Sequence, residues 1–381
     1  MIHNMIQPKP YIDTSPSVYG KFSIIAAEYK AANFTQGAPD FDTPEWLIDR
    51  ANYYMKKGKN QYAPIPGTLT LRKAIVHKTK HCYNTDINID NVIITAGAQE
   101  GLFTAISTYV RAGDEVIMFD PIFDTYAGVT KFNQGKCVRL KLLPNGNIDV
   151  QAIANAITER TKIIILNSPH NPMGTIISKS EYQEIAKIVK DKDILVISDE
   201  VYEHIYAGEN FTSAIEIPEL RNKLVLLQSL GKTYNVTGWR QGVMIAPADI
   251  IKNVLAIKQF STFSAVHPLQ LSLAEGILEH PEYYENLHKL YKKQNALLRE
   301  NMKGSRFKIL EWRGSPFQMI DYSEINNEDD HTFATKLIKE YGVGVVPMST
   351  LFETPQHKFL RICFAKKDAE IIKGAKILAQ I

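Results

Sequence analysis

The chain of 381 residues contains only three cysteines, Cys82, Cys137 and Cys363, which lie far apart. Three separated cysteines provide neither a disulfide framework nor a metal-ligand spacing, so we expect a reducing environment and structural roles for all three. No apolar run approaches the length that spans a bilayer. The first residues have no charged-then-apolar signal architecture. These absences predict a cytoplasmic protein with no membrane segment.

The chain also has little excess charge. Its formal net charge is +3, which is too small to predict a nucleic acid or an anionic membrane as a partner. The hydrophobic fraction of 45% and the charged fraction of 22% are ordinary for a globular protein. A chain of this length is long for one hydrophobic core, so two domains are expected.

Apolar, β-branched runs recur along the chain, with helical stretches between several of them. Most of the runs are continuously apolar, as parallel strands are when both faces of the sheet are covered. The alternation predicts an open α/β sheet. The runs are Asn91–Thr95, Glu115–Phe119, Lys162–Leu166, Ile194–Ile197, Lys223–Leu227 and Gly242–Ala246.

Helical patterns are clearest in two places. Residues 179–190 are amphipathic, with Ser180 as the predicted N-cap. A charged helical stretch at about 282–303 is predicted to lead into a second domain. That domain would hold strands near 318–320 and 359–363, and a closing helix.

The segment Ser229–Lys232, directly after the fifth run, is the most informative in the chain. Its lysine can form a Schiff base with an aldehyde cofactor. Ser229 and Arg240, which lies eight positions after Lys232, can hold an anion beside it. A single lysine after a strand is more often structural, so the other strand ends decide the matter.

In open α/β sheets, ligands bind at the carboxyl ends of the strands. The first run ends in a small-residue turn, Thr95–Glu100, which can bind an anion or be a plain turn. Phe123 follows the second run, and its side chain can stack on a flat ring or pack in the core. The loop Asn167–Pro172 offers amide donors. Asp199 follows the fourth run and needs a partner if it is buried. That partner could be a protonated pyridine nitrogen or an ordinary ion pair, or Asp199 could be a helix N-cap. Five compatible strand ends together favour pyridoxal phosphate.

Short motifs, several of them at these strand ends, match one known family. They are Gln36–Phe41, Asn60–Pro64, Thr95–Ala98, Asn167–Pro172, Asp199–His204, Gly231–Tyr234, Thr237–Arg240 and Leu360–Lys367. On these motifs the chain resembles the class I/II pyridoxal-phosphate aminotransferases of fold type I, over nearly its whole length. Within them it resembles the kynurenine/glutamine-phenylpyruvate transaminase branch, and most strongly the bacterial methionine aminotransferases. The motifs are much less specific for the substrate than for the family.

The resemblance implies an architecture and an assembly. The large cofactor-binding domain would be residues 46–283, with a mostly parallel seven-stranded sheet. A smaller α+β domain would be built from both termini, residues 1–45 and 284–381. The expected assembly is a homodimer with active sites at the subunit interface.

The resemblance also implies roles around the cofactor ring. Lys232 would hold pyridoxal phosphate covalently and then move the proton at the substrate's Cα. A free lysine, with a pKa of about 10.4, would be a poor base without cationic neighbours. Asp199 would keep the pyridine nitrogen protonated, and Phe123 would stack on the ring. Asn171 and Tyr202 would hydrogen-bond the phenolic oxygen.

The implied phosphate site combines backbone and side chains. The N–H groups of Ala98 and Gln99 would bind the phosphate together with Ser229 and Arg240. Tyr62 would reach it from the partner subunit.

The implied substrate site centres on one arginine. Arg361 would clamp the substrate carboxylate with a two-pronged bond, with Asn171 beside it. Gly37 would let the chain pass close to that carboxylate, and Tyr19 would lie over the substrate side chain. The chain departs from the family pattern at Pro316, where an aromatic residue is usual, which leaves the shape of the pocket rim open.

The implied reaction is a ping-pong transfer of an amino group to a 2-oxo acid. An aromatic wall of Tyr19, Phe123 and Tyr62 favours methionine or another large apolar or aromatic L-amino acid over aspartate. One alternative keeps the fold and changes the reaction, to a C–S β-lyase acting on cysteine conjugates. A second is a non-catalytic sensor domain of a transcription regulator. Such regulators carry an N-terminal helix-turn-helix domain, for which the residues before Gln36 leave no room, so we expect an enzyme.

Overall fold

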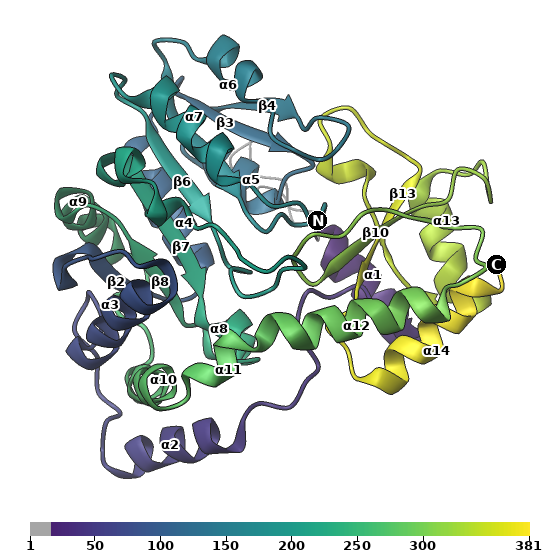
Figure 1. The fold of residues 1–381 in the computed structure, drawn as a ribbon, viewed down its shortest axis with the longest axis horizontal. Coiled ribbons are helices and arrows are strands. Elements are labelled where there is room, and N and C mark those ends of the chain that lie inside the picture. Colours follow the sequence, from purple (N-terminus) through teal and green to yellow (C-terminus); the bar gives the residue numbers. More distant parts are fainter. Residues whose placement is uncertain (1–16) are drawn as a thin grey trace, which may run out of the picture.

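The structure is a computed structural model that describes residues 17–381. Residues 1–16, part of the predicted small domain, lie outside the described residues. Two sheets organise the chain, one in the middle of the sequence and one near its C-terminal end (Figure 1).

The larger sheet has seven strands and confirms the predicted α/β architecture. Strand β8 runs antiparallel to both of its neighbours, and the other pairs are parallel. In spatial order the strands are β2 (Val92–Thr95), β8 (Gly242–Ile245), β7 (Leu224–Ser229), β6 (Leu195–Asp199), β5 (Thr161–Asn167), β3 (Glu115–Asp120) and β4 (Lys136–Lys141).

The edge strand β4 was not predicted, and its composition explains why. It reads Lys-Cys-Val-Arg-Leu-Lys, and none of its residues is fully buried. An edge strand pairs on one side only and keeps charged side chains in water, so it lacks the continuous apolar run of the central strands.

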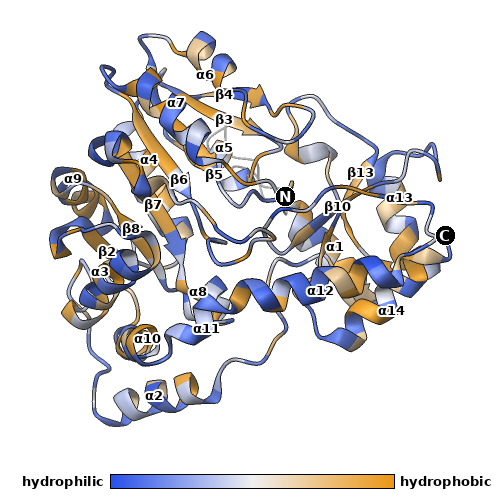
Figure 2. Cartoon of the chain, viewed as in Figure 1, coloured by the Kyte–Doolittle hydropathy of each residue, from blue (hydrophilic) through white to orange (hydrophobic). Residues whose placement is uncertain are grey.

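Helices cover both faces of this sheet, as continuously apolar strands require. Successive side chains of a strand point to opposite faces. Accordingly, Ile163 and Ile165 pack with Leu102 and Ile106 of one layer, while the intervening Ile164 packs in the other. Figure 2 shows the strands largely hydrophobic and several helices divided into a hydrophobic and a hydrophilic side.

The helices of the described chain include those predicted at 179–190 and about 282–303 and a closing helix. They are α1 (Val18–Glu28), α2 (Glu45–Lys56), α3 (Leu69–Tyr83), α4 (Ala98–Tyr109), α5 (Asp124–Phe132), α6 (Val150–Ala156), α7 (Lys179–Val189), α8 (Leu230–Thr233), α9 (Ala248–Lys258), α10 (His267–Glu279), α11 (Pro281–Glu285), α12 (Leu287–Asn301), α13 (Asp330–Lys336) and α14 (Asp368–Ala379).

The predicted N-cap of α7 was wrong by two residues. Ser178, not Ser180, accepts a hydrogen bond from the N–H of Glu181 at 3.2 Å. The Glu181 carboxylate accepts in return from the N–H of Ser178 at 2.7 Å. This reciprocal capping box satisfies two N–H groups at once, which Ser180, inside the helix, cannot do.

The second sheet has four antiparallel strands, and it confirms the strands predicted near 318–320 and 359–363. Its order is β12 (Val346–Pro347), β13 (Phe359–Cys363), β10 (Phe317–Asp321) and β9 (Lys308–Ile309). A short parallel pair joins β1 (Ala32–Asn33) to β11 (Val343–Gly344). The N-terminal and C-terminal parts of the chain therefore lie side by side, as the purple and yellow segments in Figure 1 show.

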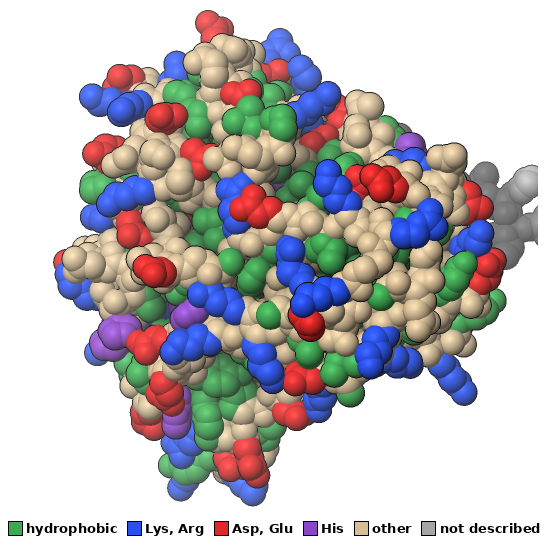
Figure 3. Space-filling view, turned by 45° about the vertical axis from the view of Figure 1, so that its right-hand side comes forward, with side chains coloured by type: hydrophobic (Ala, Val, Ile, Leu, Met, Phe, Trp, Pro, Cys, Tyr) green, Lys and Arg blue, Asp and Glu red, His purple; other side chains and the backbone are tan. Residues whose placement is uncertain are grey.

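The surface fits the small net charge. On the face that Figure 3 shows, basic and acidic side chains are interspersed over the molecule. Within residues 17–381, no helix has the length and apolarity to cross a membrane. The same part of the chain holds no cluster of His, Cys, Asp and Glu suited to a metal ion.

Candidate active site

A cavity of about 400 Å³ lies where the strands of the large sheet end and β13 and the residues around Gly37 approach them. Of the thirteen residues predicted for the site, all but Tyr62 line it. They are Tyr19, Gly37, Ala98, Gln99, Phe123, Asn171, Asp199, Tyr202, Ser229, Lys232, Arg240 and Arg361.

Lys232 lies on the short helix α8, directly after strand β7. The Ser229 hydroxyl caps this helix by accepting from the N–H of Lys232 at 3.3 Å. The Lys232 amine donates to the carbonyl oxygen of Gly37 at 2.5 Å and lies 5.6 Å from the centre of the Tyr202 ring. Burial lowers the pKa of Lys232 to about 8, and the positive charges of Arg361 and Arg240 act in the same direction. A substantial fraction of the amine is therefore neutral near pH 8.

Asp199 ends strand β6 and is only 4% exposed. Its Oδ2 accepts a hydrogen bond from the hydroxyl of Tyr126 at 2.6 Å. Burial raises the pKa of Asp199 to about 6, against the lowering effect of the Tyr126 hydrogen bond. A cation placed beside this carboxylate would be strongly favoured, because the carboxylate is buried at the wall of the cavity.

The turn between β2 and α4 brings backbone N–H groups close to the guanidinium of Arg240. Gly97 has a φ of 77° and ψ of 161° and precedes Ala98 and Gln99, whose N–H groups are in the first helical turn. A Cβ on Gly97 would lie 2.4 Å from Nη2 of Arg240. Arg240 also donates to the carbonyl of Thr237 at 3.2 Å. The turn thus brings unpaired N–H groups and a guanidinium to one end of the cavity.

Arg361, on strand β13, lies between two aromatic rings at the other side of the cavity. Its guanidinium carbon is 4.4 Å from the centre of the Tyr19 ring and 4.0 Å from that of Phe317. It donates to Oδ1 of Asn171 at 3.0 Å and to the carbonyl of Thr35 at 2.8 Å. Its buried Nε has no hydrogen-bond partner within the described residues. A carboxylate in the cavity would provide acceptors for this guanidinium.

Beside Pro316, where the sequence departs from the family pattern, Phe317 contributes an aromatic ring to the cavity. Phe317 lines the cavity and meets the ring of Tyr202 edge-on, with ring centres 5.6 Å apart. A Cβ on Gly37 would lie 3.0 Å from Cζ of Phe317, so a larger residue there would have to displace the Phe317 ring slightly. Pro316 itself accepts a hydrogen bond from the N–H of Phe364 through its carbonyl, at 3.0 Å.

Tyr62 is the one predicted site residue that does not reach the cavity of its own chain. Its side chain is 80% exposed and packs edge-on against the ring of Phe263, with centres 5.3 Å apart. Within one chain, the aromatic residues that line the cavity are Tyr19, Phe123, Tyr126, Tyr202 and Phe317. Burial raises the pKa of Tyr19 to about 12, so its hydroxyl stays protonated at neutral pH.

Sequence reasoning assigned no role to several residues that line the cavity. Tyr126 lies three residues after Phe123, and nothing in the sequence shows that its hydroxyl meets Asp199. Asn167 opens the loop that carries Asn171: its Nδ2 donates to the carbonyl of Asp199 at 2.9 Å and its Oδ1 accepts from the N–H of Asn171 at 2.8 Å. The remaining cavity residues without an assigned role are Gly20, Gln36, Ala38, Leu102, Val201 and Phe317.

Comparison with known proteins gives one consistent result. The family model "Aminotransferase class I and II" matches residues 29–377. The methionine aminotransferase of Escherichia coli is 38% identical over the full length of both chains. The kynurenine–oxoglutarate transaminase of Dictyostelium discoideum is 32% identical over 96% of this chain and 95% of its own.

Solved structures agree with this result. An Escherichia coli protein whose crystal structure and reactivity identified a methionine aminotransferase function superposes with a TM-score of 0.96. It is 37% identical, over 99% of this chain and all of its own. The N-succinyldiaminopimelate aminotransferase of Mycobacterium tuberculosis superposes with a TM-score of 0.92 at 28% identity, over 96% and 97% of the two chains. The chain therefore belongs to the class I and II aminotransferases, a family of pyridoxal-phosphate-dependent enzymes that act on amino acids and 2-oxo acids.

Proposed function

We propose that this aminotransferase uses pyridoxal phosphate to move the amino group of methionine, or of another large apolar or aromatic L-amino acid, to a 2-oxo acid. One observation carries the proposal. A single cavity contains a lysine amine with a pKa of about 8, a buried carboxylate, an anion-binding turn and a buried arginine. These are the groups needed to hold a phosphorylated pyridine aldehyde and an amino acid together.

The donors and acceptors of the cavity fit the cofactor. The N–H groups of Ala98 and Gln99, with Ser229 and Arg240, would hold its phosphate, because the dipole of α4 and the guanidinium both favour negative charge there. The buried Asp199 would pair with the ring nitrogen.

The ring has a place between these two anchors. Phe123 would lie against it, and Asn171 and Tyr202 would bind its phenolic oxygen. When bound, pyridoxal phosphate supplies an aldehyde carbon that exchanges the amino group and a ring that withdraws electrons.

The chain's own groups then position the substrate and move its proton. Arg361 would bind the substrate carboxylate, and the rings of Tyr19 and Phe317 keep water from its guanidinium. The Lys232 amine, neutral at a pH near its lowered pKa, would take the proton from Cα and hold it for return. Asp199 would hold the proton of the ring nitrogen, which keeps the ring an electron acceptor.

The proposed substrate class depends on the wall of the cavity and on the relatives. Tyr19, Phe123 and Phe317 offer an apolar, aromatic surface. In the described chain, the only arginines that line the cavity are Arg240, at the anion-binding turn, and Arg361. No further guanidinium of this chain is therefore placed for the distal carboxylate of aspartate. The similarity to the methionine aminotransferase of Escherichia coli supports the same choice.

The proposed assembly is a cytoplasmic homodimer in which Tyr62 of each subunit serves the site of the other. The exposure of Tyr62 outside its own cavity supports this arrangement. We also propose the division into a large domain, 46–283, and a small domain, 1–45 and 284–381. A hydrophobic cluster drawn mainly from the proposed small domain, including Phe22, Phe34, Leu298 and Leu360, supports it, and Tyr202 and Ile205 of the proposed large domain pack into the same cluster.

A titration of the purified enzyme loaded with pyridoxal phosphate tests the function. L-amino acids are added one at a time, without a 2-oxo acid, while the cofactor absorbance and the released 2-oxo acid are measured. We expect methionine to convert the cofactor with one equivalent of its 2-oxo acid, and aspartate to be much slower. Conversion by aspartate alone would refute the proposed substrate class. Steady pyruvate release from a cysteine conjugate without an acceptor would show a C–S β-lyase instead.

A further inference from the structure

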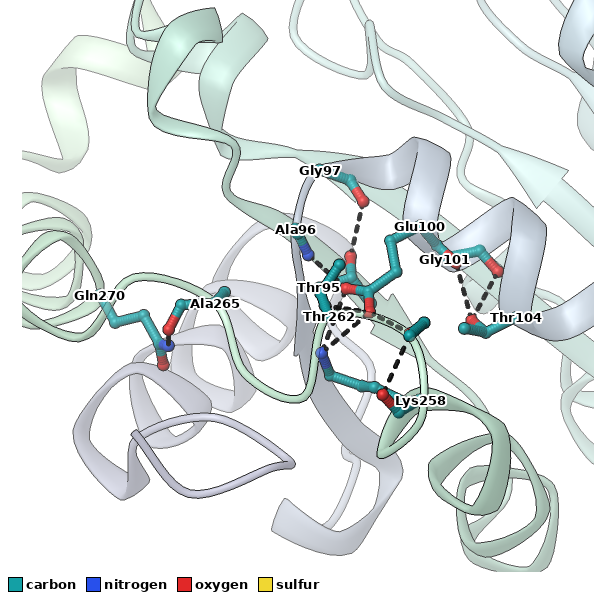
Figure 4. Close-up of polar contacts among 11 residues, drawn as sticks. Thr95, Ala96, Gly97, Glu100, Gly101, Thr104, Lys258, Thr262, Ala265 and Gln270 are labelled. Carbon is teal, nitrogen blue, oxygen red and sulfur yellow. Dashed lines mark hydrogen bonds and ion pairs between the residues drawn. The ribbon is translucent and has the colours of Figure 1, made fainter. Parts of the chain in front are cut away.

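The buried carboxylate of Glu100 is outside the reaction proposed above. Glu100 is at the third position of α4, is 7% exposed and does not line the cavity. Its Oε2 accepts a hydrogen bond from the N–H of Ala96 at 2.5 Å. Figure 4 shows this carboxylate between the turn that begins at Thr95 and the side chains of Lys258 and Thr262. The contact reaches back across Gly97, whose hydrogen atom cannot cap the helix as a serine or threonine side chain would.

The charge of Glu100 is balanced by a segment distant in sequence. The Lys258 ammonium, at the C-terminal end of α9 and 0% exposed, lies 3.2 Å and 3.1 Å from the two carboxylate oxygens. The hydroxyl of Ser261 donates to Oε1 at 2.9 Å, and the hydroxyl of Thr262 donates to the same oxygen. Burial raises the pKa of Glu100, but these donors and the Ala96 N–H together lower it further than burial raises it. The carboxylate is therefore ionised at neutral pH and can accept a charge-assisted hydrogen bond.

The turn that Glu100 holds is also restrained by the pairing of Thr95 with Gly242 of β8 and by two local hydrogen bonds. The Thr95 hydroxyl donates to the carbonyl of Gly97 at 2.9 Å, and the N–H of Gly97 donates to the carbonyl of Thr95 at 2.8 Å. The second of these contacts holds the carbonyl of the peptide between Thr95 and Ala96, and Glu100 is the acceptor for the N–H of the same peptide. The rotation of that peptide helps to set the direction in which the following N–H groups point. Without an acceptor for Ala96, this peptide could turn to satisfy its N–H elsewhere.

We propose that Glu100 is a positioning residue for the cofactor phosphate: it fixes the Ala96 peptide and so directs the N–H groups of Ala98 and Gln99 into the cavity. Lys258, Ser261 and Thr262 hold the carboxylate in place. This inference rests on the proposed function, because it concerns the turn assigned to the phosphate. It assigns Glu100 no contact with the phosphate or the substrate.

Two double variants separate the hydrogen bond from the charge. In Glu100→Gln with Lys258→Met the pair is neutral, and the glutamine oxygen can still accept from Ala96. In Glu100→Leu with Lys258→Met the pair is also neutral, but no acceptor remains. The measurement is the dissociation constant of each apoenzyme for pyridoxal phosphate and for pyridoxal, which has the same aldehyde ring and no phosphate. The thermal midpoint and circular dichroism of each variant confirm that it is folded.

We expect the glutamine variant to bind both ligands within about threefold of the parent, and the leucine variant to bind pyridoxal phosphate about tenfold or more weakly. Binding of pyridoxal should change by less than about threefold, because pyridoxal makes no use of the turn. Equal loss for both ligands would reduce Glu100 to a general structural residue and overturn the proposal. Equal affinity of the two variants for pyridoxal phosphate would also overturn it.

A second substitution covers the case in which the leucine variant does not fold. Glu100→Asp keeps the charge opposite Lys258 but withdraws the carboxylate from Ala96 by one methylene, and the same selective loss is expected. If the parent enzyme itself fails to bind pyridoxal phosphate, the proposed function fails, and that result is distinct from any difference between variants.

Discussion

Tyr126 donates a hydrogen bond from its hydroxyl to Oδ2 of Asp199 at 2.6 Å, inside the wall of the cavity. The hydroxyl is buried, and both burial and the nearby Asp199 charge raise the pKa of Tyr126, so it remains a donor at neutral pH. Asp199 is thereby held in one orientation with its other oxygen near the N–H of Val201, at 3.4 Å. This pair links the end of β6 to helix α5.

Tyr126→Phe should impair catalysis more than folding. Without the hydroxyl, the pKa of Asp199 rises above its value of about 6, because the hydrogen bond that lowers it is lost. A carboxylate with a higher pKa is more easily protonated itself, and in its neutral form it would no longer stabilise a protonated ring nitrogen. We therefore expect kcat to fall about tenfold, as for loss of a hydrogen bond to a charged group. Steady-state kinetics with methionine measure the effect. Tyr182→Phe, which removes another buried hydroxyl near a different carboxylate, Glu200, should leave kcat close to the parent value. Equal losses in both variants would contradict a specific role for Tyr126.

Lys232 should react with the cofactor aldehyde in its neutral form. Because burial lowers the pKa of Lys232 to about 8, the neutral fraction rises through this pH. The initial rate at which the apoenzyme captures pyridoxal phosphate should therefore increase between about pH 7 and 9, with a midpoint near 8, and level off above. Stopped-flow absorbance measures this rate. A midpoint near the ordinary lysine value of about 10.4 would show that the amine is not perturbed.

Arg361→Lys should weaken substrate binding and leave the cofactor in place. A lysine cannot donate at once to Asn171, to the carbonyl of Thr35 and to a carboxylate, and it loses the planar stacking between Tyr19 and Phe317. We expect the KM for methionine to rise tenfold or more, with the cofactor absorbance unchanged. An unchanged KM would place the carboxylate site elsewhere.

Gly97→Ala should weaken the binding of the cofactor phosphate. An added Cβ would lie 2.4 Å from Nη2 of Arg240, and the φ of 77° is strained for alanine. We expect the dissociation constant of pyridoxal phosphate to rise at least about tenfold, as measured by absorbance titration. Gly113→Ala is a matched control, since Gly113 has a φ of 86° but nothing within 4 Å of the added carbon. The control should lower the thermal midpoint without changing cofactor affinity.

The sequence predicted the sheet and most of the site because strand ends leave a strong local signal. A buried apolar run followed by a small turn, an aspartate or a lysine can be recognised without coordinates, and Asp199 and Lys232 were found in that way. The edge strand β4 was missed because its half-exposed residues carry charge. The hydrophobic pattern also could not predict that β8 runs antiparallel to its neighbours, because a buried strand has the same composition in either direction.

The contacts that complete the site join segments distant in sequence, and no local pattern encodes them. Tyr126 and Asp199 are 73 positions apart, and Lys258 and Glu100 are 158 apart. Pro316 left the shape of the pocket rim open in the sequence, and the structure places the neighbouring Phe317 in the lining of the cavity.

Tyr62 provides a test of the assembly that uses two inactive proteins. Its side chain is 80% exposed and does not line its own cavity, so Tyr62→Ala should weaken the cofactor site of the partner subunit. Mixed dimers of a Tyr62→Ala subunit and a Lys232→Ala subunit then contain one site with both an intact lysine and an intact tyrosine. Co-expression with two affinity tags isolates these dimers, and we expect them to regain up to about half of the parent kcat per dimer, since one of two sites is restored. If Tyr62 acted within its own subunit, every site in the mixed dimer would carry one defect, and activity would stay at the level of the single variants.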